Sequence, residues 1–136
     1  MSAHIQFELV SPEKKLVSEA VYMAVMPGDE GMFGALGGHC SLVSSLKPGV
    51  VRVYRAENDA PVKYFIAGGF ADVNAQTCTI LAEEALRVED LDQDSLEQYL
   101  RDLNEDLEMA EEKTYRNRVK QKIAVTKAKL AAISGY

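Results

Sequence analysis

The chain has 136 residues, 47% of them hydrophobic, which is enough for one globular domain and an additional element. Its net charge of −6 argues against nucleic acid as the main partner, because phosphate neutralisation needs an excess of Lys and Arg. Two cysteines are too few for a disulfide scaffold, and no run approaches the roughly 20 apolar residues of a membrane span. The first ten residues enter a strand pattern without a leader, so we expect a soluble protein in a reducing compartment.

Up to about Ala85 the hydrophobic pattern has a period of two, which is typical of strands with one buried face. The pattern opens with Ile5, Phe7 and Leu9 and continues over residues 16–26. Further strands are expected over residues 50–54, 62–67, 70–73 and 77–82. Turns are expected at Pro27-Gly28-Asp29, Lys47-Pro48-Gly49, Asn58-Asp59-Ala60-Pro61 and Gly68-Gly69. Eight or more short strands without a helix-length stretch before residue 87 predict an antiparallel β-sandwich or barrel.

From Leu91 the period changes to 3.6, which indicates amphipathic helices. The first apolar stripe contains Leu96, Leu100, Leu103, Leu107 and Ala110, and the second contains Val119, Ile123, Thr126, Leu130 and Ile133. Asp94 followed by Glu97 fits a capping box, and Asp92 is an equally plausible N-cap.

This helical region inverts its charge halfway along. Residues 88–112 carry eleven acids and one base, whereas residues 113–136 carry seven bases and no acid. No Gly or Pro occurs between Arg87 and Ser134, so the region could form one rod of about 60 Å or two antiparallel arms. We favour the hairpin, because it sets the acidic arm beside the basic arm. If there is a turn, residues 114–117 are the weakest helical stretch.

No residues in the sequence predict a catalytic, cofactor or metal site. The glycine-rich stretch 28–40 lacks the spacing of a phosphate loop, and its glycines fit turns and close backbone approaches better. His39 and Cys40 are adjacent, so on a strand they point to opposite faces and do not form a nucleophile–base pair. A metal site would require both of them to converge with His4 and Cys78 without any short ligand spacing.

The apolar pair Met32-Phe33 follows the acids Asp29 and Glu30 in this glycine-rich stretch. Two interpretations stay open. The pair belongs to the core, or it forms a docking surface at the tip of a loop.

Several segments, in this order, resemble the ε subunit of the F-type ATP synthase in its bacterial form, which is equivalent to the mitochondrial δ subunit. The N-terminal ones are Val10-Ser11-Pro12-Glu13, the stretch from Gly28 to Leu42, and Leu46-Lys47-Pro48-Gly49-Val50-Val51-Arg52-Val53. They are followed by Gly68-Gly69-Phe70-Ala71-Asp72-Val73, the stretch from Thr79 to Ala85, and Asp90-Leu91-Asp92. The resemblance is close over residues 5–92 and rests on architecture and length beyond them.

The resemblance implies an N-terminal antiparallel β-sandwich, residues 1–87, that binds the γ subunit and the c-ring. It implies a C-terminal antiparallel two-helix hairpin over residues 88–136. Such a protein is a non-catalytic rotor subunit of the central stalk, which couples ion-driven rotation of the membrane c-ring to γ and to ATP synthesis. An apolar sandwich face packs on γ. The subunit would be peripheral, at the cytoplasmic face of the bacterial inner membrane, and would reach the membrane only through the complex.

The resemblance also assigns contact residues. The c-ring contact would consist of Glu30, Gly31, Met32, Phe33, Gly34 and His39. When the helices extend, Arg116, Arg118, Lys120 and Lys122 would meet an acidic segment of the catalytic β subunit and block ATP hydrolysis.

Two departures from the family pattern affect these implications. Residues 37–41 read Gly-Gly-His-Cys-Ser where the family usually shows Pro-Gly-His-Ala-Pro, which should loosen that turn. In the ATP-binding motif of some members, Leu91-Asp92 fits, but Ser95-Leu96 replaces Arg-Ala, so we expect no ATP site. From the residues alone, a second hypothesis is a free regulatory adaptor whose basic helix switches between its own acidic helix and an acidic partner.

Overall fold

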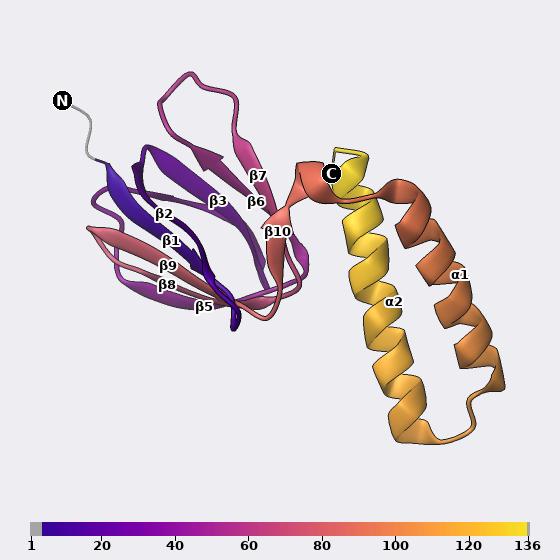
Figure 1. Cartoon of the computed structure of the whole chain (residues 1–136). Coiled ribbons are helices and arrows are strands. Elements are labelled where there is room, and N and C mark those ends of the chain that lie inside the picture. Colours follow the sequence, from indigo (N-terminus) through magenta and orange to yellow (C-terminus); the bar gives the residue numbers. More distant parts are fainter. Residues whose placement is uncertain (1–3, 136) are drawn as a thin grey trace. The chain divides into compact units, whose positions relative to one another are not determined.

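The structure, a computed structural model, describes residues 4–135. The chain divides between Arg87 and Val88 into two compact units. The first unit consists of strands and the second of helices (Figure 1). The predicted fold class, a β-sandwich followed by an antiparallel helical hairpin, is confirmed. No helix in the described part of the protein is both long enough and apolar enough to cross a membrane.

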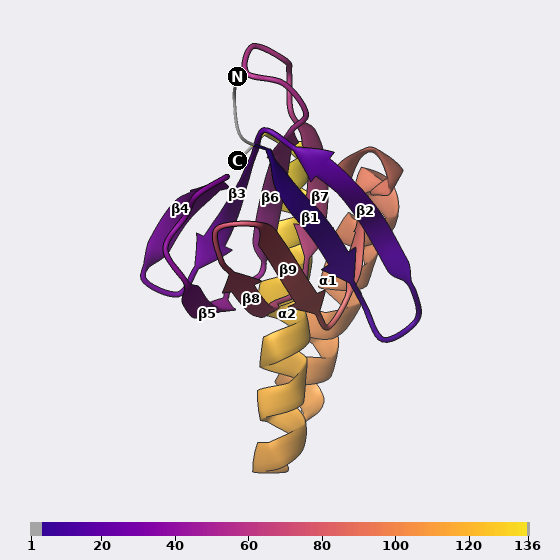
Figure 2. The same ribbon diagram turned by 90° about the vertical axis from the view of Figure 1, so that its left-hand side faces the viewer.

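Over residues 4–87 the first unit contains ten strands. They are β1 (Ile5–Val10), β2 (Lys15–Val21), β3 (Met23–Gly28), β4 (Gly31–Leu36), β5 (Leu42–Leu46), β6 (Gly49–Tyr54), β7 (Val62–Ile66), β8 (Gly69–Val73), β9 (Thr77–Ala82) and β10 (Ala85–Arg87). Their order in the sheet is β10-β7-β6-β3-β5-β8-β9-β1-β2, and β4 pairs with β3. Figure 2 shows β1, β8 and β9 as a layer in front of β6 and β7.

Most ladders are antiparallel, as predicted, but β1 and β9 run parallel, with Phe7 opposite Cys78. Strands β4 and β5 were not predicted. The first lies in the glycine-rich stretch, and the second contains two serines that hide its alternation. The turn predicted at Pro27-Gly28-Asp29 is displaced, because Pro27 and Gly28 still belong to β3.

The core of the sandwich comes from the inward residues of the alternating strands. Ile5, Phe7 and Leu9 are fully buried, as their spacing predicts. Met26 and Ile66 are buried with them. Removal of each of these side chains from water contributes about 1.5–3 kcal/mol, so the core fixes the strands on which the surface residues stand.

The second unit begins with a short 3₁₀ helix, η1 (Val88–Asp90), and continues with α1 (Gln93–Met109) and α2 (Lys113–Ile133). Asp92 is the N-cap of α1, so of the two predicted caps the structure contains Asp92 rather than Asp94. Its carboxylate accepts from the backbone N–H of Asp94 at 3.1 Å and from the hydroxyl of Ser95 at 2.8 Å.

The helices form the predicted hairpin, but the predicted position of its turn is wrong. The backbone bends over residues 110–112, whereas residues 114–117 lie inside α2. The reason is Glu112, whose carboxylate caps the N-terminus of α2 and outweighs the weak helix propensity that follows it. Between the arms, an apolar seam contains buried Leu103, Val119 and Ile123 and half-buried Leu100 and Leu107.

Candidate functional site

The β3–β4 hairpin ends in an exposed tip, residues 29–34. Gly28 pairs with Gly31, so Asp29 and Glu30 form the turn. Gly28 also pairs with Leu46, which sets the end of β3 between β4 and β5. A side chain at Gly28 would come within 2.9 Å of the carbonyl oxygen of Gly31 and 3.0 Å of the Phe33 ring. Gly28 therefore allows the two strands of the hairpin to approach closely, as the sequence predicts.

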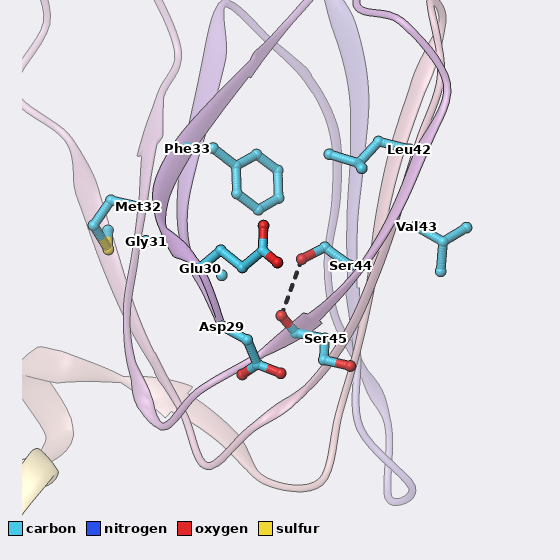
Figure 3. Close-up of a pocket in the computed structure, with 10 residues that line it drawn as sticks. Asp29, Glu30, Gly31, Met32, Phe33, Leu42, Val43, Ser44 and Ser45 are labelled. Carbon is cyan, nitrogen blue, oxygen red and sulfur yellow. Dashed lines mark hydrogen bonds between the residues drawn. The ribbon is translucent and has the colours of Figure 1, made fainter.

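A groove of about 510 Å³ lies between the tip and β5. Its lining consists of Gly28, Asp29, Glu30, Gly31, Met32, Phe33, Leu42, Val43, Ser44 and Ser45. Figure 3 shows the carboxylate of Glu30 directed toward Ser44 and the ring of Phe33 toward Leu42. The hydroxyl of Ser44 donates to the carbonyl oxygen of Ser45 at 3.0 Å. The groove thus combines an apolar side with a negatively charged end.

The structure separates the two residues: Phe33 belongs to the core, and only Met32 stays a candidate for a docking surface. Met32 is 53% exposed and points away from the groove (Figure 3). Phe33 is partly buried and packs against the sandwich core. The tip therefore presents one apolar side chain to solvent and is anchored by the other.

The structure does not bring His39 to the tip. The residue follows the far end of β4, where the backbone N–H of Gly38 donates to the carbonyl oxygen of Ala75 at 2.8 Å. Its ring Nδ1 contacts the carbonyl oxygen of Cys40 rather than the thiol. Of the six predicted contact residues, Glu30 to Phe33 line the groove, and Gly34 packs beside Met23.

The two thiols lie in unlike environments. Cys40 is exposed, whereas Cys78 is buried on β9. Burial, together with the negative charge of Asp72, raises the pKa of Cys78 to about 12, so this thiol stays protonated and unreactive. Among residues 4–135, no group of three or more His, Cys, Asp and Glu side chains is placed to hold a metal ion.

The predicted basic residues all lie near the start of α2 but differ in their surroundings. Arg118, Lys120 and Lys122 are exposed. Arg116 is partly buried, and its guanidinium donates to the carbonyl oxygens of Leu107 at 2.6 Å and Ala110 at 2.9 Å. Three of the four residues are therefore open to a partner in the hairpin, and Arg116 is engaged.

An apolar patch on the outer face of the sandwich was not located from the sequence. Val10, Leu81 and Phe70 lie opposite one another on β1, β9 and β8. Phe70 and Leu81 are each 57% exposed, and all three residues line a shallow hollow of about 330 Å³. The available signal was the alternation of the strands: Leu81 stands at an outward position between two buried residues, and Phe70 at an outward position before buried Ala71. We call Val10, Phe70 and Leu81 the outer patch.

Two protein-family models match the sequence. The model "ATP synthase, Delta/Epsilon chain, beta-sandwich domain" matches residues 4–88. The model for the C-terminal domain of the ATP synthase epsilon chain matches residues 92–136.

Relatives and solved structures agree with these models. The ATP synthase epsilon chain of Rhodospirillum centenum is 42% identical over 139 residues, covering 98% of this chain and 94% of that protein. The Brucella anthropi epsilon chain is 48% identical over 92 residues, covering 68% and 67%. A chain in the cryo-EM structure of the Euglena gracilis mitochondrial ATP synthase, OSCP/F1/c-ring, superimposes with a TM-score of 0.84 at 26% identity, over 98% of this chain and 83% of that one.

Proposed function

Because this chain belongs to the ATP synthase delta/epsilon family, we propose that it is a non-catalytic rotor subunit in the central stalk of an ATP synthase. It would couple ion-driven rotation of the c-ring to the γ subunit and so to ATP synthesis. The proposal is carried by one observation: both units of the chain match parts of the same family, in the same order. The subunit would be peripheral, held through the complex at the cytoplasmic face of a bacterial inner membrane.

The tip is the proposed contact with the c-ring. Met32 offers an exposed apolar side chain there, and Glu30 adds negative charge beside it. Gly31 and Gly34 flank Met32 and Phe33, so the polypeptide at the tip stays narrow. His39 would contribute only from the far end of β4, so we expect it to matter less than Met32.

The outer patch is the proposed contact with γ. A subunit that stays bound in a stalk needs an apolar interface centre, and the exposed side chains of Phe70 and Leu81 fit that need. The patch lies on β1, β8 and β9, whereas the tip consists of the turn after β3 and the first residues of β4, so the two proposed contacts use separate elements of the sandwich.

These two contacts can be tested with a photoreactive amino acid placed at Met32 or at Leu81 in the assembled complex. Ala60, exposed in the turn between β6 and β7, provides the control position. We expect cross-links from position 32 to the c-ring and from position 81 to γ. Cross-links no stronger than those from position 60 would refute the proposed contacts, and failure of γ and the c-ring to co-purify with a tagged chain would refute the rotor role.

The second proposed role is a brake on ATP hydrolysis. Arg116, Arg118, Lys120 and Lys122 would bind an acidic segment of the catalytic β subunit when the helices extend. The support is the surplus of seven bases without an acid over residues 113–136. A complex assembled with residues 1–87 should hydrolyse ATP faster than one with the full chain. Equal rates would count against the brake.

The charge inversion also supports a second candidate function, a free regulatory adaptor whose basic helix leaves its acidic helix for another acidic protein. Deleting residues 88–136 separates the two functions. The rotor subunit should still support coupling after the deletion, whereas the adaptor would lose its activity. Cys40→Ser should leave ATP turnover of the complex unchanged, because we assign no chemistry to this exposed thiol.

A further inference from the structure

The sheet of the first unit leaves strand β4 with an unpaired edge. Among the residues that the structure describes, β2 and β10 end the order of strands, and β4 pairs only with β3. Figure 2 shows β4 at the margin of the sandwich, with β5 below it in that view. Strand β5 pairs with β3 only at Leu46, so most of its side toward β4 is open as well. The groove between the tip and β5 is therefore an open edge of the sandwich.

The register of the β3–β4 hairpin shows which backbone groups face this edge. Pro27 lies opposite Met32, and its carbonyl oxygen accepts from the backbone N–H of Lys47 at 2.8 Å, on the side away from β4. Pro27 and Met32 therefore form a pair without hydrogen bonds, and so do Val25 and Gly34, two residues further along. The N–H and C=O groups of Met32 and Gly34 consequently point away from β3, toward the open edge.

The edge strands differ in their protection against pairing with another chain. Natural edge strands avoid such pairing by charged side chains, by Pro, or by being very short. Strand β2 carries Lys15 and Glu19, both in ion pairs, and β10 has three residues and ends in Arg87. Strand β4 has six residues, Gly-Met-Phe-Gly-Ala-Leu, with no charge and no Pro. Its edge has none of these protections, as expected of an edge that another strand covers.

The side chains beside this edge define what fits along it. On the outer face, Met32 and Leu36 are 53% and 41% exposed, and Gly34 between them has no side chain. On the inner face, Phe33, which packs against the core, and Leu42 form the apolar part of the groove (Figure 3). Successive side chains of a strand point to opposite faces, so a strand added to β4 would meet apolar surface on both.

The charged end of the groove determines how such a strand would be oriented. Asp29 and Glu30 form the turn of the hairpin, and the carboxylate of Glu30 points toward Ser44 across the groove (Figure 3). Within residues 4–135, the ion pairs involve neither of these two carboxylates. A Lys or Arg of the added segment would therefore be attracted to this end, whereas an acidic residue would be repelled.

We propose that the open edge of β4 binds an extended segment of another protein chain by strand addition. The segment is apolar in its middle and carries a Lys or Arg beside Asp29 and Glu30. Main-chain hydrogen bonds to Met32 and Gly34 hold it, and the two apolar faces select its side chains. The presence of this chain in an ATP synthase complex rests on the function proposed above. Backbone pairing goes beyond that function, which assigns to the tip a contact by its side chains.

Amide hydrogen exchange, resolved to single residues, tests the pairing in the isolated full-length chain and in the assembled complex. In the isolated chain the amides of Met32 and Gly34 should exchange quickly, whereas those of Phe33 and Ala35, which face β3, should be protected. In the complex we expect Met32 and Gly34 to exchange about 100-fold more slowly.

Two results of this measurement would overturn the proposal. Unchanged exchange of Met32 and Gly34 in a complex that assembles would exclude strand addition and leave the rotor role standing. Protection that rises with the concentration of the isolated chain would identify a second copy of this chain as the occupant.

Gly34→Pro separates a main-chain bond from simple coverage of the tip by side chains. The substitution removes an N–H that faces the open edge and none that faces β3, and proline is tolerated at such edge positions. Protection of Ala35 in the isolated variant reports that the hairpin is intact. In the complex, Met32 should then exchange about tenfold faster than in the parent protein.

Gly34→Ala is the matched control. It keeps the N–H and adds a Cβ 3.4 Å from the sulfur of Met23, as proline also does, so its effect on Met32 should be much smaller. Equal effects of the two substitutions would show that packing, and not strand pairing, covers the edge.

A photoreactive amino acid at Leu42, on the inner side of the groove, identifies the occupant in the assembled complex. We expect it to attach to a segment that contains a Lys or Arg next to apolar residues, and the double substitution Asp29→Asn and Glu30→Gln should reduce the yield. Attachment to a segment without a basic residue would overturn the stated chemistry. A yield no higher than that from position 60 would show that no chain occupies the groove.

Discussion

At the residue scale, the difference between the two cysteines gives a direct probe of the sandwich. Cys78 faces the core, and its burial raises its pKa to about 12, while Cys40 lies exposed after β4. The thiolate attacks the disulfide of the reagent, so the reagent needs access to the cysteine. We expect a chromogenic disulfide reagent to titrate one thiol in the native protein and both in denaturant, with Cys40→Ser removing the native reaction. Rapid reaction of both thiols in the native protein would contradict the buried position of β9.

Glu112 gives a second residue-scale prediction, through the ionisation of its carboxyl group. Its pKa is held below the ordinary value of 4.5 because the carboxylate accepts the backbone N–H groups of Tyr115 and Thr114. A folded-state pKa below the unfolded value means that this cap stabilises the hairpin above the unfolded pKa. The contribution is lost as the pH falls through the folded pKa.

The measurement is a carboxyl-carbon NMR titration of Glu112 in the native protein and in urea. We expect the pKa of Glu112 to be lower in the native protein than in urea. We also expect α2 to lose helicity as the pH falls below that pKa, and Glu112→Gln to make this loss smaller. An equal or higher native pKa would show that the carboxylate does not cap α2.

At the element scale, the β8–β9 ladder depends on Gly69. Its φ of +150° is unfavourable for other residues, and an added Cβ would lie 2.1 Å from the carbonyl oxygen of Leu81. We expect Gly69→Ala to reduce stability on the order of 3 kcal/mol, measured as the loss of hydrogen-exchange protection at Ile80. Gly38→Ala is the control, because its Cβ would meet open space and only the φ of +86° opposes it, at about 1 kcal/mol. Equal losses of stability in the two variants would mean that the β8–β9 ladder can move to accommodate the added Cβ.

The elements also show how far the sequence can be interpreted. Alternation identified β1 and β9, and the 3.6 period identified both helices and their seam, because each pattern reports a local burial face. The parallel pairing of β1 with β9 is non-local and leaves no trace in either segment. The turn of the hairpin was misplaced because Glu112 and Arg116 stabilise it by side-chain bonds that propensity does not register.

The candidate contacts were predictable to different degrees. Residues of the tip were identified by resemblance, and the structure gathers Glu30 to Phe33 but separates His39 from them. Arg116 was grouped with its basic neighbours, because sequence spacing does not show that its guanidinium caps α1. The outer patch was expected only as an unspecified sandwich face, since the register of three strands assembles it.

The turn over residues 110–112 leads to a prediction about the brake, again at the element scale. Lys113 is the first residue of α2, where proline is tolerated, but a proline is incompatible with the interior of a continuous helix. If braking requires a continuous helix, Lys113→Pro should therefore release it, and the complex should hydrolyse ATP as fast as one containing residues 1–87. Lys113→Ala removes the same charge without a proline and should keep the brake. Hydrolysis that stays slow with Lys113→Pro would show either that the closed hairpin itself inhibits ATP hydrolysis or that the helices are not the brake.

At the scale of the whole molecule, the protein joins two units to which the proposed function gives different tasks. The sandwich carries two separate surfaces, the tip and the outer patch, around one buried core. The hairpin keeps an acidic arm against a basic arm across a small apolar seam. In the proposed rotor the first unit transmits torque, and the second sets whether hydrolysis is permitted. The central claim concerns the first unit.

Ion-driven ATP synthesis in membrane vesicles tests that claim most directly. Vesicles would contain the complex assembled without this subunit, with the full-length subunit, or with residues 1–87. We predict little synthesis without the subunit and restoration by both the full-length form and residues 1–87, because the tip and outer patch lie within the sandwich. Synthesis that proceeds equally well without the subunit would contradict the coupling role, and restoration by the full-length form alone would favour the adaptor.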